Sequence, residues 1–440
     1  MRGPSGTLPR RPCDDGGGRA AAMTLNALDD HTLPFSCATV TRKGAASVAG
    51  RSIRLFNVKY SPNLGDGVLS ECLEEALARR LGAADVASID LAGREAYGGS
   101  GAGRHLALSV LNNLPQPVRR TAVRLPLALQ SRRKWRPHYK TGLKACDAVV
   151  IGGGNLLADL DLNFPTKLAL ALDEAARRDL PVAFYGVGCA ARWSDTGRHM
   201  LARVLARTDL KAVFVRDDAS RINWNRLFGH ALHVLAELVR DPGLLASETY
   251  RAARPISVGR RVGLGIMSDT AVRYHSDVVL RPGELADWYV AAASALCQDG
   301  ASVVAFTNGS PEDKAMLAAI AERLEAAAPS VAFVEPRTPA ELCETIAGLD
   351  RLIAFRMHAI IVAYSYGVPA LALHWDPKLD AFMASVGLSE QVVAIGNAAP
   401  SGIPRRLDAA AAVFPSERRR ERILAETRAG IGRLAAALEV

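Results

Sequence analysis

Short apolar runs alternate along most of this chain with longer segments of helical spacing. The first run, 52–58, leads into a segment with helical periodicity at 67–77. Further runs in this half predict strands at 147–151, 181–185, 211–215 and 233–235. Continuous apolar runs between helices are typical of parallel strands that are buried on both faces of a sheet. The pattern therefore predicts a doubly wound α/β domain over residues 51–245.

A second series of the same kind follows residues 246–260, which we interpret as a linker because they contain Ser, Thr, Pro and Gly. Its predicted strands lie at 261–266, 302–306, 331–334, 351–355 and 370–375, with helical segments between them. We expect a second doubly wound domain over 261–395 and a helical tail over 396–440, in which 415–438 has amphipathic spacing. Two such domains predict a substrate cleft between them.

Composition gives three further expectations, for the N-terminal residues, for membrane-spanning helices and for the cysteines. Residues 1–50 contain three consecutive glycines and few large apolar side chains, so we expect a disordered N-terminal tail. No signal-peptide pattern is present there, and no apolar run is long enough to predict a membrane-spanning helix. The seven cysteines show no zinc-ligand spacing, which favours reduced thiols in a cytoplasmic protein and no metal.

Charge is concentrated in one segment. The chain carries a net charge of +9, but residues 97–146 contain ten Lys or Arg and no Asp or Glu, so the remainder is close to neutral. The protein is therefore not a general nucleic-acid binder. We place this segment as an insertion between the first two predicted strands. Trp135 and its flanking arginines suit peripheral contact with an anionic inner membrane face or a lipid pyrophosphate; the alternative is a solvated, partly disordered basic loop.

Candidate chemistry is densest at 351–378. Arg356 and His358 follow one predicted strand and open a helix, and Lys378 follows the next strand. Ligands of open α/β sheets bind at the carboxyl ends of strands, where a helix N-terminus adds partial positive charge. This cationic group suits a small, strongly anionic ligand. The alternative is structural: Arg356 would pair with an Asp, and His358 would cap the helix.

The first predicted domain supplies weaker signals at the same kind of position. Gly65 would permit a tight turn after the first strand, with Asp66 as the N-cap of the helix that follows. A glycine-rich turn follows the strand at 147–151, and Arg216 ends the strand at 211–215. The residues that we expect to line the cleft or contact an acceptor are Asn63, Gly65, Gly153, Gly154 and Asn155. Capping loops and tight turns would need the same residue types.

Taken together, these motifs resemble the polysaccharide pyruvyl transferase family. The matching motifs occur in family order at 63–66, 150–155, 186–188, 215–220, 241–242, 312–313, 356–358, 367–369 and 378. The resemblance implies a GT-B-like fold, with two Rossmann-like domains facing a cleft and a C-terminal helix. It also implies transfer of a pyruvyl group from phosphoenolpyruvate to a sugar of a polysaccharide or its lipid-linked precursor, which leaves a pyruvate ketal. On this basis we expect a role in exopolysaccharide biosynthesis.

The resemblance assigns roles to the candidate residues. It implies a phosphoenolpyruvate site made by Arg216, Arg356, Met357, His358 and Lys378. His358 would be the general acid, Arg356 would bind the donor, and Lys378 would stabilise the leaving phosphate. Asp66 would act as a base or sugar ligand. No cofactor is expected, because phosphoenolpyruvate is a donor substrate and cationic side chains can neutralise its charge.

Two other functions remain open at this point. A GT-B nucleotide-sugar glycosyltransferase in surface polysaccharide synthesis would usually need a carboxylate in the second domain to hold ribose hydroxyls. The strand ends at 350–378 carry Arg, His and Lys instead, with only Asp376 and Asp380 nearby. A non-catalytic sugar-binding or regulatory protein could use the same fold without the reaction.

Overall fold

In the computed structural model, residues 51–82, 85–98, 126–159, 161–252, 259–270, 272 and 281–438 are described. They belong to one compact unit. The predicted N-terminal tail lies outside the described residues, as do parts of the predicted linker and of the basic segment.

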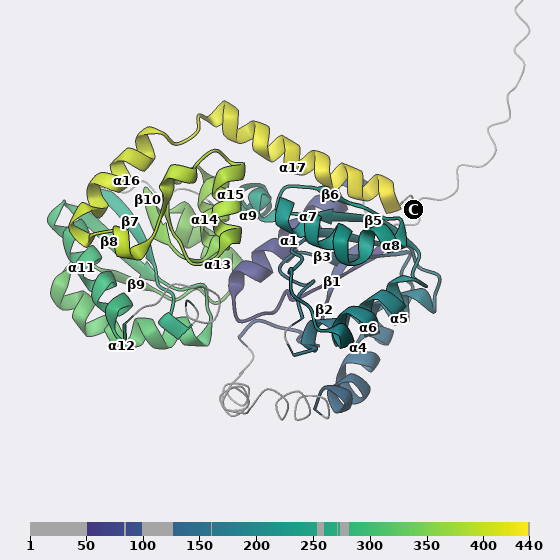
Figure 1. Ribbon diagram of the computed structural model, residues 1–440. Helices are drawn as coiled ribbons and strands as arrows, with labels where there is room; N and C mark the ends of the chain where they lie inside the picture. Colours follow the sequence, from purple (N-terminus) through teal and green to yellow (C-terminus); the bar gives the residue numbers. More distant parts are fainter. Residues whose placement is uncertain are drawn as a thin grey trace, which may run out of the picture. The chain divides into compact units, whose positions relative to one another are not determined.

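The first half of the chain forms a sheet of six parallel strands in the order β2-β1-β3-β4-β5-β6 (Figure 1). Its strands are β1 (Ser52–Asn57), β2 (Asp85–Asp90), β3 (Ala148–Gly152), β4 (Val182–Val187), β5 (Leu210–Val215) and β6 (Ala236–Leu238). The accompanying helices are α1 (Leu64–Leu81), α4 (Arg136–Gly142), α5 (Asn163–Ala176), α6 (Asp195–Leu205), α7 (Asp218–Trp224), α8 (His230–Leu232) and α9 (Ala246–Tyr250).

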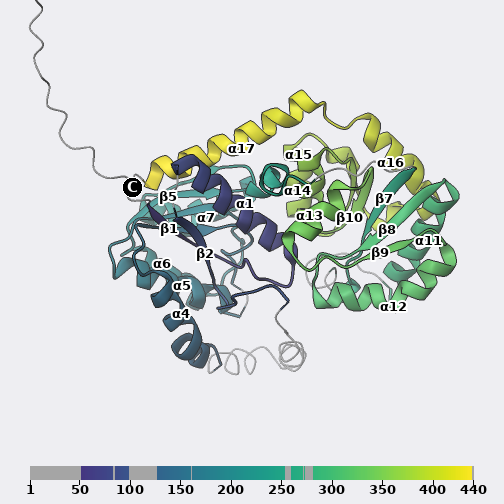
Figure 2. The same ribbon diagram turned by 180° about the vertical axis from the view of Figure 1, so that it is seen from behind.

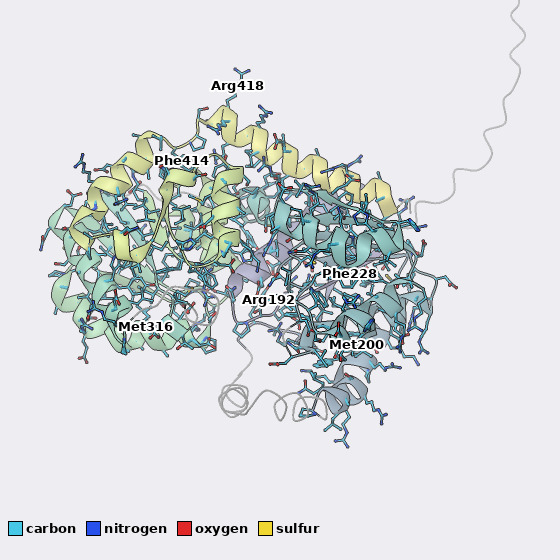
Figure 3. The ribbon with its side chains drawn as sticks, in the orientation of Figure 1. Arg192, Met200, Phe228, Met316, Phe414 and Arg418 are labelled. Atoms are coloured by element: carbon cyan, nitrogen blue, oxygen red, sulfur yellow. The ribbon has the colours of Figure 1, made fainter. Side chains whose placement is uncertain are left out.

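Alternate residues of the central strands enter different hydrophobic cores, because successive side chains of a strand point to opposite faces. Leu55 and Val150 pack into one core, whereas Phe56 and Val149 pack into the other. Phe228, labelled in Figure 3, lies in the second core with its ring centroid 5.3 Å from that of Trp224. Both faces of the sheet are therefore covered, as a doubly wound architecture requires.

The second half forms another six-stranded parallel sheet, in the order β12-β11-β10-β7-β8-β9. Its strands are β7 (Arg260–Gly265), β8 (Ala301–Phe306), β9 (Ala332–Val334), β10 (Arg351–Ala354), β11 (Ala370–Leu373) and β12 (Val392–Val393). Its helices are α11 (Glu284–Gln298), α12 (Pro311–Ala327), α13 (Pro339–Ala347), α14 (Met357–Tyr366), α15 (Pro377–Ser385) and α16 (Ile403–Ala412).

The last helix, α17 (Glu417–Leu438), connects the two halves (Figures 1 and 2). Near its start, Arg420 donates to the carbonyl oxygen of Ser365 in α14 over 2.7 Å. Near its end, Arg433 donates to the carbonyl oxygen of Leu238 in β6 over 2.8 Å. The predicted C-terminal helix therefore begins beside the second sheet and returns to the first.

Several sequence-based boundaries are wrong in detail. Strand β2 was not predicted, so the basic insertion lies between the second and third strands rather than between the first two. The strand expected at 233–235 lies at Ala236–Leu238, because His233 adopts a left-handed conformation that ends α8. The predicted linker begins with a helix, α9.

The described end of the basic segment contradicts part of the membrane-contact hypothesis. Trp135 ends a π-helical turn at Ser131–Trp135, and only 2% of its surface is exposed. The Nζ atom of Lys167, on α5, lies 4.9 Å from a ring centroid of Trp135. Burial against α5 removes more of this large side chain from water than an interface would, so Trp135 is a core residue. None of the helices in the described part of the chain has the length and apolarity needed to cross a bilayer.

Candidate active site

A pocket of about 170 Å³ lies at the carboxyl ends of strands from both sheets. The first sheet contributes residues that follow β1, β3 and β5, and the second contributes residues that follow β8, β10 and β11. The lining residues are Asn63, Asp66, Gly154, Asn155, Arg216, Asn308, Arg356, Met357, His358, Trp375, Asp376, Lys378 and Leu379. This is the location at which open α/β sheets bind ligands.

The N-terminus of α14 opens into this pocket without a side-chain cap. Arg356 occupies the N-cap position, and its side chain makes no capping hydrogen bond. The neighbouring helix α15 differs, because Asp376 at its N-cap accepts from the backbone N–H of Lys378 over 2.9 Å. The first N–H groups of a helix carry partial positive charge, and those of α14 are not occupied by a side chain of their own helix end. An anion in the pocket would meet them.

Arg356 both pairs with an Asp and lines the pocket, two roles that the sequence left as alternatives. Its Nη2 atom lies 2.7 Å from Oδ2 of Asp313, and its Nε atom donates to the same oxygen over 2.9 Å. The Asp313 side chain is fully buried, and burial raises the pKa of its carboxyl group while Arg356 opposes that rise. The guanidinium also lies over the ring of Trp375, at 5.9 Å from its centroid. Arg356 is thus held rigidly by a buried carboxylate while it lines the pocket.

His358 is buried, with 8% of its surface exposed. Its Nε2 atom has no hydrogen-bond partner among the described residues. Burial lowers the pKa of the imidazole, and the carboxylates of Asp241 and Asp66 oppose this effect. The side chain does not cap α14, so this part of the structural alternative is wrong. Burial therefore favours the neutral form of this imidazole.

Two further cations reach the pocket from different sheets. Arg216, which follows β5, has a 7% exposed side chain and lies 3.7 Å from Asp217 and 3.8 Å from Asp241. Lys378, on α15, has its Nζ atom 3.8 Å from Oδ2 of Asp376. Burial lowers the pKa of Lys378, and Arg216 lowers it further, while Asp376 opposes both. An additional negative charge between Arg216 and Lys378 would relieve their repulsion.

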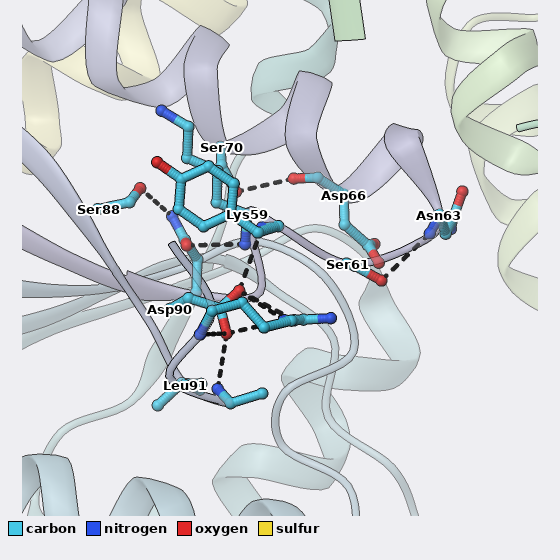
Figure 4. A network of polar contacts seen from close by, with 12 residues as sticks. Lys59, Ser61, Asn63, Asp66, Ser70, Ser88, Asp90 and Leu91 are labelled. Atoms are coloured by element: carbon cyan, nitrogen blue, oxygen red, sulfur yellow. Dashed lines mark hydrogen bonds and ion pairs between the residues drawn. The ribbon is translucent and has the colours of Figure 1, made fainter. Parts of the chain in front are cut away.

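The first turn of α1 corrects the predicted cap. Asn63, rather than Asp66, is the N-cap, and its Oδ1 atom accepts from the N–H of Gly65 over 3.3 Å. Asp66 therefore lies within the helix, where its carbonyl oxygen accepts from the hydroxyl of Ser70 over 2.8 Å (Figure 4). Asp66 is one of the pocket-lining residues. Below this turn, Asp90 accepts from the N–H of Tyr60 over 3.1 Å and thereby supports the loop after β1.

Gly65 and Gly153 do not line the pocket, but each permits close packing next to it. A Cβ atom on Gly65 would lie 2.6 Å from Cβ of His358, so only glycine lets α1 approach the catalytic candidate this closely. Gly153 has a φ of 74° and abuts Leu69. Gly154, at a φ of 68°, has open space beside it and lines the pocket with Asn155, whose Oδ1 atom is buried without a hydrogen-bond partner in the described structure.

The remaining predicted residues lie together, but the sequence did not single out every contributor. Asn308 and Trp375 were not singled out, and they line the pocket together with Asp376. Asp313 and Asp241, which belong to the matching motifs but had no assigned role, act on Arg356 and His358 through their charge. Asn308 and Trp375 each follow a strand of the second sheet, so the rule that selected Arg356 could have found them. No group of three or more His, Cys, Asp or Glu that could hold a metal ion occurs among the described residues. The absence of a cofactor remains a prediction.

Comparison with known proteins assigns the family. A family model for polysaccharide pyruvyl transferases matches residues 63–377, which span most of the chain and all of the pocket-lining residues except Lys378 and Leu379. This chain belongs to the polysaccharide pyruvyl transferase family. The predicted resemblance is confirmed, and membership implies a transferase that acts on a sugar or polysaccharide. No match was found among curated proteins.

A solved structure with a TM-score above 0.5 supports the fold assignment. A protein from Listeria monocytogenes assigned as a UDP-N-acetylglucosamine 2-epimerase is 11% identical, with a TM-score of 0.55 over 89% of this chain and 96% of that chain. A UDP-GlcNAc 2-epimerase from Neisseria meningitidis is 12% identical, with a TM-score of 0.49 over 88% and 99%. Similarity at this level of identity concerns the fold alone. The predicted GT-B-like pair of Rossmann-like domains is confirmed.

Proposed function

We propose that this pyruvyl transferase takes its pyruvyl group from phosphoenolpyruvate and attaches it across two hydroxyls of a sugar as a ketal. The observation that carries the proposal is the convergence of Arg216, Arg356 and Lys378 on one small pocket beside the uncapped end of α14. Phosphoenolpyruvate is a small molecule with a carboxylate and a phosphate. Arginine forms bidentate pairs with both groups, and a helix N-terminus favours phosphate.

The two halves of the protein hold the donor jointly in this proposal. Arg356, fixed by Asp313, and the N–H groups of Met357 and His358 bind one anionic group from the second sheet. Arg216 binds from the first sheet. Lys378 lies on α15 and stabilises the phosphate as it leaves.

Two sugar hydroxyls supply the two oxygens and the two protons that the reaction needs. A proton added to C3 of phosphoenolpyruvate converts its methylene to a methyl group and leaves C2 electrophilic. The oxygen of the first hydroxyl forms a bond to C2, and its proton balances the one added to C3. The bond from C2 to the phosphate oxygen then breaks, and the second hydroxyl adds to C2 while its proton passes to the departing phosphate. The products are a pyruvate ketal and inorganic phosphate.

His358 is the proposed source of the C3 proton, although burial favours its neutral form in the free protein. The donor resolves this conflict, because its negative charges next to the imidazole favour the imidazolium. Binding would therefore charge the acid only when its substrate is present. Asp66, which lines the same pocket, is the candidate base or hydroxyl ligand.

Calorimetric titration of phosphoenolpyruvate into the wild type and Lys378→Ala tests the donor assignment. Lys378 suits this test because it is not in a tight ion pair, so its removal should leave the fold intact. We expect at least a tenfold loss of affinity. Lys211→Ala is the matched control, because Lys211 is an exposed cation on β5, remote from the pocket-lining residues. Equal affinity in all three proteins would contradict the proposal, and binding of UDP-sugars instead would favour the glycosyltransferase alternative.

A role in exopolysaccharide biosynthesis and a cytoplasmic site of action accompany this proposal. The five cysteines in the described part of the chain are free thiols, in keeping with the cysteine pattern. Peripheral contact with an anionic membrane now rests on exposed Arg132, Arg133 and Lys134, together with Leu129, which is 49% exposed. Co-sedimentation with vesicles of anionic lipid at low salt tests that contact, and no binding would refute it.

A further inference from the structure

A second cavity, of about 840 Å³, adjoins the proposed donor pocket beneath α17. The two cavities share three lining residues, Arg216, Met357 and Lys378. The larger cavity extends from this junction between the ends of β5 and β6, helices α14 and α15, and one face of α17. Its volume falls in the upper part of the range of about 300–1,000 Å³ that is typical of sites for drug-sized ligands. It is larger than a single sugar ring requires.

Buried polar atoms along this cavity lack hydrogen-bond partners in the described part of the protein. They are Nε of Arg216, Oδ2 of Asp217 and Oδ2 of Asp241. Each carboxylate uses its other oxygen to cap a helical turn: Asp217 accepts from the N–H of Ser220 over 2.7 Å, and Asp241 from that of Gly243 over 2.9 Å. The carboxylates are therefore fixed in place, and the second oxygen of each faces Arg216 at 3.7 Å and 3.8 Å, too far for a hydrogen bond. Such an oxygen is an acceptor for a ligand hydroxyl, and leaving it unpaired is costly.

The cations at the far end of the cavity are already neutralised. Arg240 donates to Glu426 over 2.9 Å and to the carbonyl oxygen of Ser385 over 2.8 Å. Arg433 donates to Glu237 over 2.8 Å. At the junction with the donor pocket, by contrast, the carboxylate nearest to Lys378 among the described residues is that of Asp376, 3.8 Å away. A diphosphate would find no unpaired arginine at this end.

The rest of the lining is apolar. Leu244, Ile361 and Phe382 line the cavity together with several alanines, and Phe382 provides an aromatic ring. Pyranose rings combine hydroxyls at their edges with apolar C–H faces. A cavity with fixed carboxylate oxygens, an aromatic side chain and paired cations matches that combination better than it matches a nucleotide.

We propose that this cavity is the acceptor site and that it binds an uncharged oligosaccharide segment of more than one sugar ring. The proposal rests on the function proposed above. The terminal ring would place its hydroxyl pair at the junction of the two cavities, where Arg216 and Lys378 also contact the donor. Asp217 and Asp241 would accept hydrogen bonds from the hydroxyls and orient the ring. Of the residues predicted from the sequence to line the cleft or contact an acceptor, Asn63, Gly154 and Asn155 line the donor pocket and not the larger cavity.

Filling the cavity from α17 tests the proposal. Ala429 lines the cavity and is itself exposed, so Ala429→Trp should fold while its indole blocks ligand entry. Ala425→Trp is the matched control, because Ala425 is equally exposed one turn earlier on the same helix and does not line the cavity. The wild type and both variants would be applied, with saturating phosphoenolpyruvate, to an array of neutral mono- to tetrasaccharides that also carries UDP-glucose and UDP-galactose.

We expect the wild type and Ala425→Trp to bind one or more neutral di- to tetrasaccharides, and Ala429→Trp to lose at least tenfold in that signal. Calorimetry on the same samples should give the same phosphoenolpyruvate affinity for all three proteins. Binding of only UDP-sugars, no glycan binding by the wild type, or binding that survives in Ala429→Trp would overturn the acceptor assignment. Failure of the proposed function would appear separately, as absent phosphoenolpyruvate binding in the wild type.

Discussion

At the scale of single residues, the protonation of His358 depends on its burial more than on any one neighbour. Burial lowers the pKa of its imidazole below the ordinary value of about 6.5. Because the proton is disfavoured in the folded state, this group makes the fold less stable as pH falls below that ordinary value. An anionic ligand beside the ring should reverse the shift.

We therefore predict two different titrations for His358. In the free protein its pKa should lie below the ordinary value. With saturating phosphoenolpyruvate the pKa should rise, since two anionic groups would then lie beside the ring. NMR of protein labelled with ¹³C at the histidine ring measures this, and His358→Gln identifies the signal. A pKa that phosphoenolpyruvate does not change would remove the basis for His358 as the general acid.

The ion pair of Arg356 with Asp313 allows a second test at this scale. Arg356→Met should destabilise the protein by about 3–5 kcal/mol, because it leaves a fully buried carboxylate without its partner. Adding Asp313→Asn should recover much of this loss, while phosphoenolpyruvate binding stays weak. Urea denaturation gives the free energies of unfolding. Arg323→Ala is the control: it breaks an exposed pair with Asp287 and should cost no more than about 1 kcal/mol. Similar losses for both arginines would contradict this interpretation.

At the scale of elements, the contact between α1 and α14 determines where His358 lies. Gly65→Ala should improve the helix propensity of α1 by about 0.5–1 kcal/mol, but its Cβ would lie 2.6 Å from Cβ of His358. We expect a reduced affinity for phosphoenolpyruvate and no net gain in stability. Gly432→Ala on α17 is the matched control, because the nearest atom to its Cβ is 3.5 Å away and the variant should become more stable. Calorimetric titration and thermal unfolding of both variants measure the two effects, and a Gly65→Ala protein that gains stability and binds normally would refute the argument.

The predictability of each element follows from its position in the sheet. Central strands such as β3 are buried along their whole length, so their sequences are continuous apolar runs that are easily recognised. Strand β2 lies at the edge, pairs with β1 alone among the described strands, and is buried only at Ile89 and Asp90, so its sequence carries little apolar signal. Strand β12, also at an edge, has only two residues and was missed for the same reason.

The prediction of site residues from the sequence has a similar limit. Arg356, His358 and Lys378 could be selected because the ends of consecutive strands β10 and β11 must lie side by side. The sequence could not show that Asn63, rather than Asp66, is the N-cap, because both residue types cap helices well. The close contact of Gly65 with His358 is likewise tertiary and has no local signal in the sequence.

At the scale of the whole molecule, no periodicity in the sequence brings Arg216 to Lys378, because they follow strands of different sheets. Only the family resemblance predicted that Arg216 and Lys378 would meet at one site. In the structure this arrangement is supported by α17, which hydrogen-bonds to α14 near one end and to β6 near the other. The donor pocket and the larger cavity both depend on this arrangement, since each is lined from both sheets.

A ligand held by both halves should stabilise them together, which gives the last prediction. Phosphoenolpyruvate at one hundred times its Kd should add about 2.7 kcal/mol to the free energy of unfolding. Because Arg216 and Lys378 lie in different halves, we expect a single unfolding transition to move to higher temperature. Differential scanning calorimetry measures this shift; Lys378→Ala should abolish most of it, and Lys211→Ala should not. If only one of two separate transitions moved, the donor would be held by one half alone, and the junction that serves both proposed sites would have to be abandoned.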